Sequence, residues 1–240
     1  MMSKLLKSMS KFRASHNESF YMQAQLLQDR ESITILDIGA YTGETVCKYV
    51  KTFSNAYVYA FEPFPDSFEK LVSTCKGMPV KTFNYAFSDN VEKIKLHVNA
   101  DPSCNSIFPR VKDGKKYYSE KAENIGHIEV HTTTIDHFCN EQKISYIDIL
   151  KIDVEGAEIK VFSGGLEKFS SHAIGLIYAE VTFVPHYQGG CMFHELSVFL
   201  SKYDYTLLNF YNLKKSKSGQ LRWGNAIFLS PQIRRKFERD

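Results

Sequence analysis

Residues 33–62, which read ITILDIGAYTGETVCKYVKTFSNAYVYAFE, carry the strongest structural signal in this chain. An apolar run ends in Asp37 and a glycine turn, a helical pattern follows, and a second apolar run closes on Glu62. This order of strand, turn, helix, strand and terminal acid is typical of a nucleotide-type site on a parallel sheet. Gly39 and Gly43 allow a tight turn and let a ligand approach the backbone where a Cβ would collide. We therefore expect a ligand site at this turn.

The spacing within the turn indicates which ligand it holds. The order is Asp-x-Gly-x-x-x-Gly, rather than the Gly-x-Gly-x-x-Gly that cradles a pyrophosphate at a helix N-terminus. Asp37 would repel phosphates but suits a cationic ligand that carries an amino acid. Glu62 is placed to accept hydrogen bonds from both hydroxyls of a ribose. S-adenosylmethionine combines a sulfonium, an ammonium and a ribose, so we expect it as the cofactor.

Each part of this cofactor is expected to meet a different segment. The methionine part is assigned to Asp37 and the turn backbone, the ribose to Glu62, and the adenine to the segments after the second and third strands. A glycine turn alone is often only a βα loop, Phe64 could equally pack in a core, and the Ser88–Asp89 pair could be a plain turn. The predicted cofactor-binding residues are Asp37, Gly39, Ala40, Tyr41, Thr42, Gly43, Glu62, Pro63, Phe64, Ala86, Ser88, Asp89 and Asp153.

Periodicity along the chain predicts an α/β fold with a mostly parallel sheet of about seven strands. A polar-apolar alternation interrupts it and predicts a small inserted hairpin, and the last two strands read as an antiparallel hairpin. We expect one domain over residues 1–240, with a helical extension at 1–31 and an insertion at 92–132. The long polar segment 99–126 of this insertion is expected to form a lid or substrate loop. The expected strands are 33–38, 57–61, 80–85, 92–98, 128–132, 146–152, 174–181, 205–210 and 223–229, and the expected helices are 16–30, 43–52, one starting at Pro65, a short one ending near 164–165, and 193–203.

Composition narrows the class of partner. A net charge of only +3 gives no global argument for a nucleic acid, so we expect none. Local lysine clusters leave contact with an anionic substrate or a membrane surface open. The five cysteines form no CxxC pair, which argues against a disulfide framework or a zinc site. No sustained apolar run suggests a signal peptide or a membrane span, and a reducing cytoplasm is the simplest expectation.

A second group of acids predicts the chemistry. Asp153 and Glu155 follow one buried strand, and Glu180 ends the next. In an open α/β sheet these ends meet at one rim, where ligands bind. Methyl transfer to a hydroxyl needs a base or a metal, so we assign catalysis to Asp153, Glu180 and His186. Asp153 could instead hold the amino end of the cofactor.

Several alternatives stay open at this rim. The three acids with His186 could ligate a divalent cation through hard oxygen ligands, so a metal is left undecided. A lone histidine is more often structural than catalytic. Three aromatic side chains, Tyr187, Tyr211 and Trp223, could stack on a sugar, although core packing is the likelier role of Tyr211.

Five motifs together resemble the FkbM family of S-adenosylmethionine-dependent methyltransferases. The resemblance implies a Rossmann-like class I methyltransferase fold and O-methylation of a hydroxyl, often on bacterial glycans or secondary metabolites. It also implies that Asp37, Glu62, Asp89 and Asp153 line the cofactor site. Tyr41 departs from the family, which more often has Asn at this position. The motifs are DIGAYTGE (37–44), FEPFPDSFEKL (61–71), NYAFSD (84–89), TTTID (132–136) and DILKIDVEGAEIKVFSGG (148–165).

The leading hypothesis is therefore an O-methyltransferase acting on a sugar hydroxyl in polysaccharide biosynthesis. Methylation of a lipid or a secondary metabolite is the second enzymatic hypothesis. A non-catalytic module that keeps the cofactor fold is the alternative from another class. The chain lacks an Asn-Pro-Pro-Tyr-like tetrapeptide that would clamp an extruded base, which argues against a nucleic-acid methyltransferase.

Overall fold

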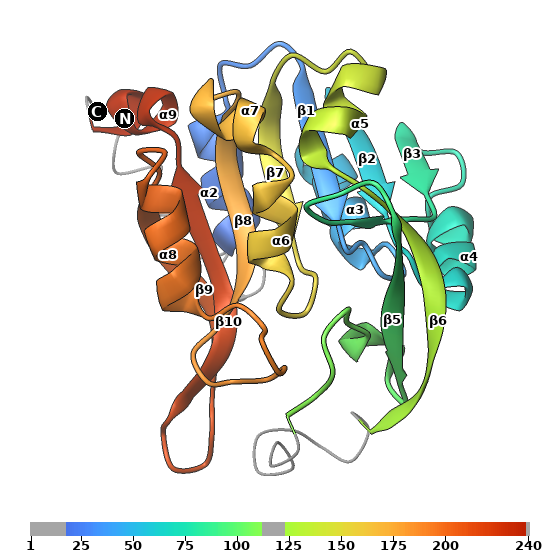
Figure 1. The fold of residues 1–240 in the computed structure, drawn as a ribbon. Coiled ribbons are helices and arrows are strands. Elements are labelled where there is room, and N and C mark those ends of the chain that lie inside the picture. The colour runs from blue at the N-terminus through green and yellow to red at the C-terminus, as the bar shows by residue number, and fades with distance from the viewer. Residues whose placement is uncertain (1–17, 112–122, 239–240) are drawn as a thin grey trace.

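A seven-stranded sheet forms the centre of the computed structural model, which describes residues 18–111 and 123–238. The strand order is β3-β2-β1-β7-β8-β10-β9 (Figure 1). Neighbours among β1, β2, β3, β7 and β8 run parallel, whereas β10 is antiparallel to both β8 and β9. The strands are β1 (Ile33–Ile38), β2 (Ala56–Phe61), β3 (Val80–Phe83), β7 (Ile147–Ile152), β8 (Ile174–Thr182), β9 (Thr206–Lys215) and β10 (Leu221–Leu229).

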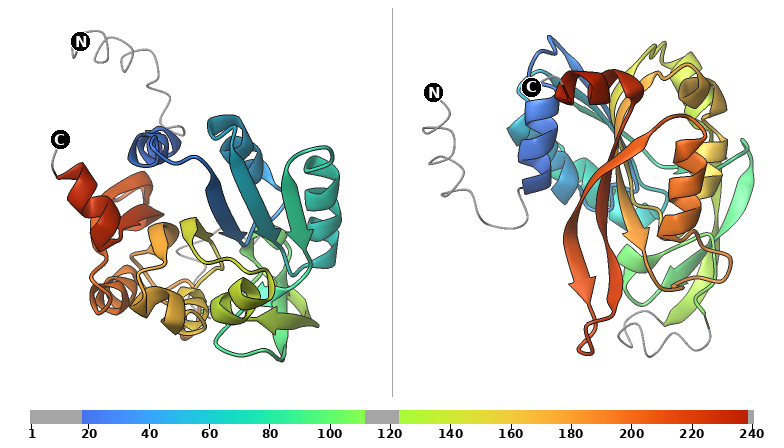
Figure 2. Two further views of the ribbon diagram at one scale, coloured as in Figure 1. Left: turned by 90° about the horizontal axis from the view of Figure 1, so that it is seen from above. Right: turned by 90° about the vertical axis from the view of Figure 1, so that its left-hand side faces the viewer.

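Helices cover both faces of this sheet, as the two views of Figure 2 show. One face packs against α2 (Glu18–Leu26), α3 (Glu44–Thr52), α4 (Pro65–Thr74) and α9 (Pro231–Phe237) through a core that includes Phe20, Tyr49, Leu71 and Ile233. The other face packs against α5 (Ile135–Glu141), α6 (Glu158–Ser163), α7 (Leu166–Ser170) and α8 (Phe193–Ser201) through a core that includes Phe138, Phe162, Phe169 and Leu200.

The central strands explain this layering. Every residue of β7 is buried, as expected for a parallel strand covered by helices on both faces. The chain first adds β2 and β3 on one side of β1 and then returns to add β7 on the other side of β1. The direction in which strands are added therefore reverses between β1 and β7. Ligands bind at such a switch point, beyond the carboxyl ends of the strands.

The inserted hairpin is also present. It consists of β5 (Lys93–Asn99) and β6 (Asn124–Thr133), which pair antiparallel, and β6 adds the short parallel strand β4 (Ala86–Phe87). A 3₁₀ turn, η1 (Pro102–Cys104), follows β5. The predicted fold class is thereby confirmed. Residues 112–122 of the predicted lid and 1–17 of the N-terminal extension lie outside the described residues.

Three short helices were not predicted, namely α5, α7 and α9. Each spans 5 to 7 residues, too few for a clear 3.6-residue periodicity. Two of them have a local start signal that the pattern missed: the Thr134 hydroxyl accepts from the backbone N–H of His137, and the Ser230 hydroxyl accepts from that of Ile233. In the parts of the chain that the structure describes, no helix has the length and apolar character needed to cross a bilayer.

Candidate active site

A cavity of about 470 Å³ lies at the carboxyl ends of the parallel strands. The turn after β1 and the end of β2 form one part of its lining, and the ends of β7 and β8 form another. Further lining residues are 85–87, Leu96, 101–107, Arg110, His186 and Trp223 of β10. We name two parts of this lining after the ligands predicted for them. The cofactor wall is made by Gly39–Tyr41, Glu62, Pro63 and Ala86, and the acceptor wall by residues 101–107, Arg110, His186 and Trp223.

The turn of the cofactor wall requires a glycine. Gly39 has a φ of +80°, and a Cβ added there would collide with the carbonyl oxygen of Asp153. The backbone N–H groups of Gly39 and Ala40 both donate to the carbonyl of Phe61, at 3.0 and 2.8 Å. Tyr41 also has a positive φ, of 49°, a conformation that asparagine adopts more readily than tyrosine. The turn is therefore held tightly between β1, β2 and β7.

Glu62 lies at the end of β2 with only 7% of its surface exposed. One carboxylate oxygen accepts from the backbone N–H of Tyr41 at 3.0 Å, and the other accepts from that of Phe64 at 2.9 Å. Burial raises the pKa of Glu62 to about 7, against the lowering effect of these two hydrogen bonds. Each oxygen keeps a further lone pair for a ligand hydroxyl.

Asp37 lies beneath this wall and not in its lining. It is fully buried, and the Lys151 ammonium is 2.9 Å from its Oδ1 atom. Burial raises the pKa of Asp37, and the charge of Lys151 opposes the shift. Lys151 also donates to the carbonyl of Gly39 at 2.6 Å. Asp37 thus supports the turn through Lys151, and its contact with the cofactor stays a prediction.

Lys151 itself was missed by the sequence analysis, although it lines the cavity. Its ammonium is also 3.8 Å from an oxygen of Asp153 and so links the β1 turn to the β7 turn. The signal was a lysine within an otherwise apolar stretch of the strand, ILKI (149–152). A buried lysine needs a buried partner, and Asp37 at the matching position of the adjacent strand β1 is that partner.

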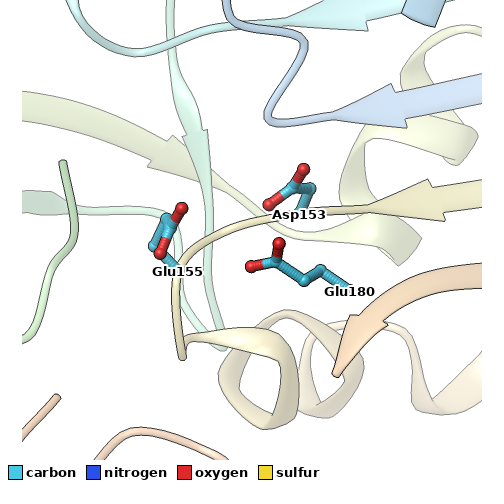
Figure 3. A group of neighbouring side chains, drawn as sticks. All are labelled: Asp153, Glu155 and Glu180. Carbon is cyan, nitrogen blue, oxygen red and sulfur yellow. The ribbon is translucent and has the colours of Figure 1, made fainter. Parts of the chain in front are cut away.

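Three carboxylates gather where β7 and β8 end. Oxygens of Asp153, Glu155 and Glu180 all lie within 4.8 Å of one another, and Figure 3 shows the three side chains converging. Burial, followed by the charge of Asp153, raises the pKa of Glu155 to about 8 and that of Glu180 well above its usual range. Glu155 is held in a left-handed conformation, with a φ of 55°. Carboxylates this close either share protons or surround a cation.

The acceptor wall is built from loops that pair with one another. The Tyr187 hydroxyl donates to Glu155 at 2.6 Å and lies 3.0 Å from the carbonyl of Cys104. The Ser106 hydroxyl donates to the carbonyl of Glu155 at 2.7 Å. These contacts fasten the segment after β5 to the turn after β7. None of them was anticipated, because the residues are distant in sequence.

His186 lines the cavity with 8% of its surface exposed. Burial lowers its pKa to about 4, and the charges of Arg110 and Arg222 act in the same direction. The imidazole is therefore neutral at physiological pH. A neutral histidine can orient a hydroxyl by a hydrogen bond, but this low pKa makes it a weak base.

Several predicted contacts lie outside the cavity lining. Asp89 accepts from its neighbour Ser88 at 2.8 Å and from Lys160 at 3.2 Å, and its contact with an adenine amine stays a prediction. Phe64 packs against the small core under β5 and β6. Tyr211 is buried in the core that packs against α2, α3, α4 and α9. The central guanidinium carbon of Arg110 lies 4.3 Å from the centroid of the Tyr187 ring and covers one face of it. Of the predicted cofactor residues, those in the lining are Gly39, Ala40, Tyr41, Glu62, Pro63, Ala86 and Asp153. Those outside the lining are Asp37, Thr42, Gly43, Phe64, Ser88 and Asp89. The predicted catalytic residues Asp153, Glu180 and His186 all line the cavity.

A family model described as the methyltransferase FkbM domain matches residues 37–207. The chain belongs to the FkbM methyltransferase family. The match begins at Asp37, at the end of β1, and covers both walls of the cavity except Trp223. As an FkbM protein the chain is an S-adenosylmethionine-dependent methyltransferase, and the predicted enzyme class is confirmed.

Two curated proteins are similar to this FkbM chain. The 2-O-methyltransferase NoeI of Sinorhizobium fredii is 27% identical over 175 residues, which cover 70% of this chain and 71% of NoeI. The hexuronic acid methyltransferase AglP of Haloferax volcanii is 28% identical over 142 residues, or 58% of this chain. The match spans 53% of AglP, about half its length.

Among solved structures, the METTL16 MTase domain superposes with a TM-score of 0.51 at 11% identity. The superposition covers 88% of this chain and 66% of that domain. At this identity the likeness supports the class I methyltransferase fold and nothing about the acceptor.

Proposed function

We propose that this protein transfers a methyl group from S-adenosylmethionine to a hydroxyl of a sugar, in a glycan or a glycan precursor. The observation that carries the proposal is the shared cavity, in which Glu62 and the Gly39 turn lie on one wall and three carboxylates lie at the ends of β7 and β8. The names of the curated relatives support the two parts of this proposal: NoeI is a 2-O-methyltransferase, which supports methylation of an oxygen, and AglP is a hexuronic acid methyltransferase, which supports a sugar.

The residues of the cofactor wall fit S-adenosylmethionine. The backbone of the Gly39 turn lines the cavity, and the remaining lone pairs of Glu62 suit the two ribose hydroxyls. Asp153 is 37% exposed and faces the cavity, so it can bind the ammonium of the methionine part. When bound, the cofactor supplies an electrophilic methyl carbon attached to a sulfonium.

We assign acceptance of the hydroxyl proton to Glu180. Its raised pKa makes it a stronger base than an ordinary carboxylate. As the sugar oxygen gained the methyl group, Glu180 would take the hydroxyl proton, and the cofactor would be left as a neutral thioether. Asp153 holds the cationic end of the cofactor, and neutral His186 orients the acceptor. Holding the two reactants in this order lowers the activation free energy by up to about 7–11 kcal/mol.

A divalent cation is the second way in which this cluster could serve the reaction. Three hard oxygen ligands within 4.8 Å of one another fit Mg²⁺, which would lower the pKa of the acceptor hydroxyl in place of a base. Turnover after treatment with a chelator separates the two mechanisms. Unchanged turnover supports proton transfer to Glu180, whereas a loss that Mg²⁺ restores supports the cation.

The proposed function is tested by offering the purified protein S-adenosylmethionine with a labelled methyl group and a mixture of nucleotide sugars. Label should appear in an ether of a sugar, and Glu180→Gln should reduce its formation by roughly 10²-fold or more, the range of a lost general base. Glu129→Gln removes a charge from an exposed residue of β6 outside the cavity lining and is the matched control.

Two outcomes would contradict the proposal. Failure of S-adenosylmethionine to bind in calorimetry would leave only a module that keeps the fold. Binding, with label found in lipids or small metabolites but not in sugars, would support the second enzymatic hypothesis.

A further inference from the structure

We propose that Trp223 is the surface on which the ring of the acceptor sugar stacks, so that this residue helps to set which sugars the cavity takes. The inference rests on the proposed function, because it names the residue of the same cavity that recognises the sugar ring. Trp223 lies beyond residues 37–207, the stretch that matches the family model, so the family resemblance gives it no role.

The aromatic side chains of the described lining lie in different parts of the cavity. Phe61 and Phe87 are 1% and 2% exposed, and their rings meet edge to face with 4.6 Å between the centroids. The Tyr85 ring lies 5.7 Å from that of Phe61, so these three rings pack on one another beside the cofactor wall. Tyr41 belongs to the turn of the cofactor wall. Trp223 lies on the acceptor wall and is only half-buried.

The other two aromatic residues that the sequence offers for stacking on a sugar are already engaged. Tyr211 is 4% exposed and packs in the core. Tyr187 is 3% exposed, and Arg110 covers one face of its ring. Neither belongs to the described lining, whereas Trp223 does. Trp223 is therefore the one of the three that is placed to meet an acceptor.

The sheet carries Trp223 to the rim where the proposed base lies. In the antiparallel pairing of β10 with β8, Trp223 is opposite Thr182, the last residue of β8, and Asn225 is opposite Glu180. Alternate residues of a strand and the residues opposite them share one face of a sheet, so Trp223 and Glu180 lie on the same face. The pairing of β10 with β9 shifts register on both sides of Trp223. Such irregularities re-aim side chains and are common next to active sites.

The cavity combines the two kinds of surface that a sugar ring needs. A pyranose has hydroxyl groups around its edge and C–H groups on its faces. An indole is a large, flat apolar surface, and stacking a C–H face on it removes apolar area from water. Carboxylates accept hydrogen bonds from hydroxyl groups. The carboxylates of the described lining are Glu44, Glu62, Asp101, Asp153, Glu155 and Glu180.

Stabilising the β9–β10 hairpin is the competing role for Trp223. The Lys214 ammonium lies 5.9 Å from the centroid of the Trp223 ring, and the two residues are opposite one another in the hairpin. This distance is at the outer end of the range of about 6 Å for a cation–π contact. One ammonium covers at most one face of an indole, so the contact does not exclude a sugar on the other face. A role confined to the hairpin would change stability but not sugar affinity.

The test uses the full chain saturated with S-adenosylhomocysteine and follows the emission of its single tryptophan, which is Trp223. Three pyranosides, namely methyl glucoside, methyl galactoside and methyl glucuronide, are titrated in turn. Glucitol, which has the hydroxyl groups of a hexose but no ring, is the control ligand. At least one pyranoside should change the emission saturably, and glucitol should not.

Calorimetry with the responding pyranoside then compares variants. Trp223→Ala should raise its dissociation constant at least about tenfold, and Trp223→Phe, which keeps a flat ring, should raise it less. Trp223→Leu keeps apolar bulk in the hairpin but removes the flat surface, so it should behave like Trp223→Ala even if that variant folds poorly. Affinity for S-adenosylhomocysteine should stay unchanged in all three. Tyr57→Ala is the matched control, because Tyr57 is an aromatic residue that is 63% exposed and outside the cavity lining.

Two results would overturn the inference. One is an emission that none of the three pyranosides changes. The other is an unchanged dissociation constant in Trp223→Leu, with a melting temperature lowered as it is in Lys214→Gln, which would assign Trp223 to the hairpin alone. Absence of S-adenosylhomocysteine binding, measured first, would count against the proposed function instead.

Discussion

The two walls of the cavity are held together by different kinds of contact. The cofactor wall is fixed by neighbouring parallel strands, a glycine turn and the buried Asp37–Lys151 ion pair. The acceptor wall is fixed by hydrogen bonds between loops, such as those of Ser106 and Tyr187 to Glu155. The first kind is part of the core, and the second can change without disturbing it. Substitutions in the two walls should therefore have different consequences for stability and for ligand binding.

The largest effect is expected from Lys151→Met. Removing the ammonium leaves Asp37 buried with an uncompensated charge, which typically costs about 3–5 kcal/mol. The free energy of unfolding, measured with urea, should fall by that amount, and cofactor binding should weaken with it. Lys95→Met, at an exposed position of β5, is the control.

A second variant sharpens this test. The double variant Asp37→Leu, Lys151→Met removes both charges and should recover much of the lost stability, since an apolar pair of similar volume can replace a buried ion pair. If Lys151→Met alone changes the free energy of unfolding by less than about 1 kcal/mol, the pair is not the support that holds the cofactor wall.

The next largest effect concerns Glu62. Glu62→Ala removes hydrogen bonds to a charged group, each contributing about 1.5–3 kcal/mol, so the dissociation constant for S-adenosylmethionine should rise at least tenfold. Binding of a sugar probe to the acceptor wall should change little. Glu129→Ala on the exposed side of β6 is the control. An unchanged cofactor affinity would refute the ribose assignment.

The next prediction concerns the pH dependence of stability. Burial raises the pKa of Glu62 to about 7, of Glu155 to about 8 and of Glu158 to about 7, from a usual value of 4.5. An acid whose pKa is higher in the folded state stabilises the fold below its unfolded pKa, and this contribution is lost as pH rises through the folded pKa. The melting temperature of the cofactor-free protein should therefore fall between about pH 4.5 and pH 8.

Cofactor affinity should show the opposite trend. A cationic ligand favours the ionised carboxylates, so S-adenosylmethionine should bind more tightly as pH rises through 7 to 8. S-adenosylhomocysteine lacks the sulfonium charge and should show a smaller rise, which makes it the matched control ligand. Parallel pH profiles for the two ligands would show that these acids do not face the sulfonium.

The difference between the walls also explains what the sequence could reveal. The cofactor wall lies within one continuous stretch, so residues such as Gly39 and Glu62 could be placed from spacing alone, and the parallel sheet followed from the apolar runs. Lys151 escaped because its role depends on Asp37 in a neighbouring strand. Ser106 and Arg110 escaped because loop pairings across about 50–80 residues leave no periodic signal.

The smallest effect is expected from the hydrogen bonds between loops. Tyr187→Phe keeps the ring that stacks with Arg110 but removes the hydroxyl that donates to Glu155. Ser106→Ala removes the neighbouring contact to the Glu155 carbonyl. Each loss should cost about 0.5–1.5 kcal/mol in acceptor binding, with cofactor affinity unchanged.

The double variant then asks whether the two contacts act together. Both contacts fasten one segment to the turn after β7. The loss of acceptor affinity in the double variant should therefore be smaller than the sum of the two single losses. Calorimetry with a nucleotide sugar on the protein saturated with S-adenosylhomocysteine measures this coupling. Additive losses would mean that the two loops hold their positions independently. A fall in cofactor affinity equal to that in acceptor affinity would mean that the two walls behave as one unit, which would contradict the division drawn here between core and loop contacts.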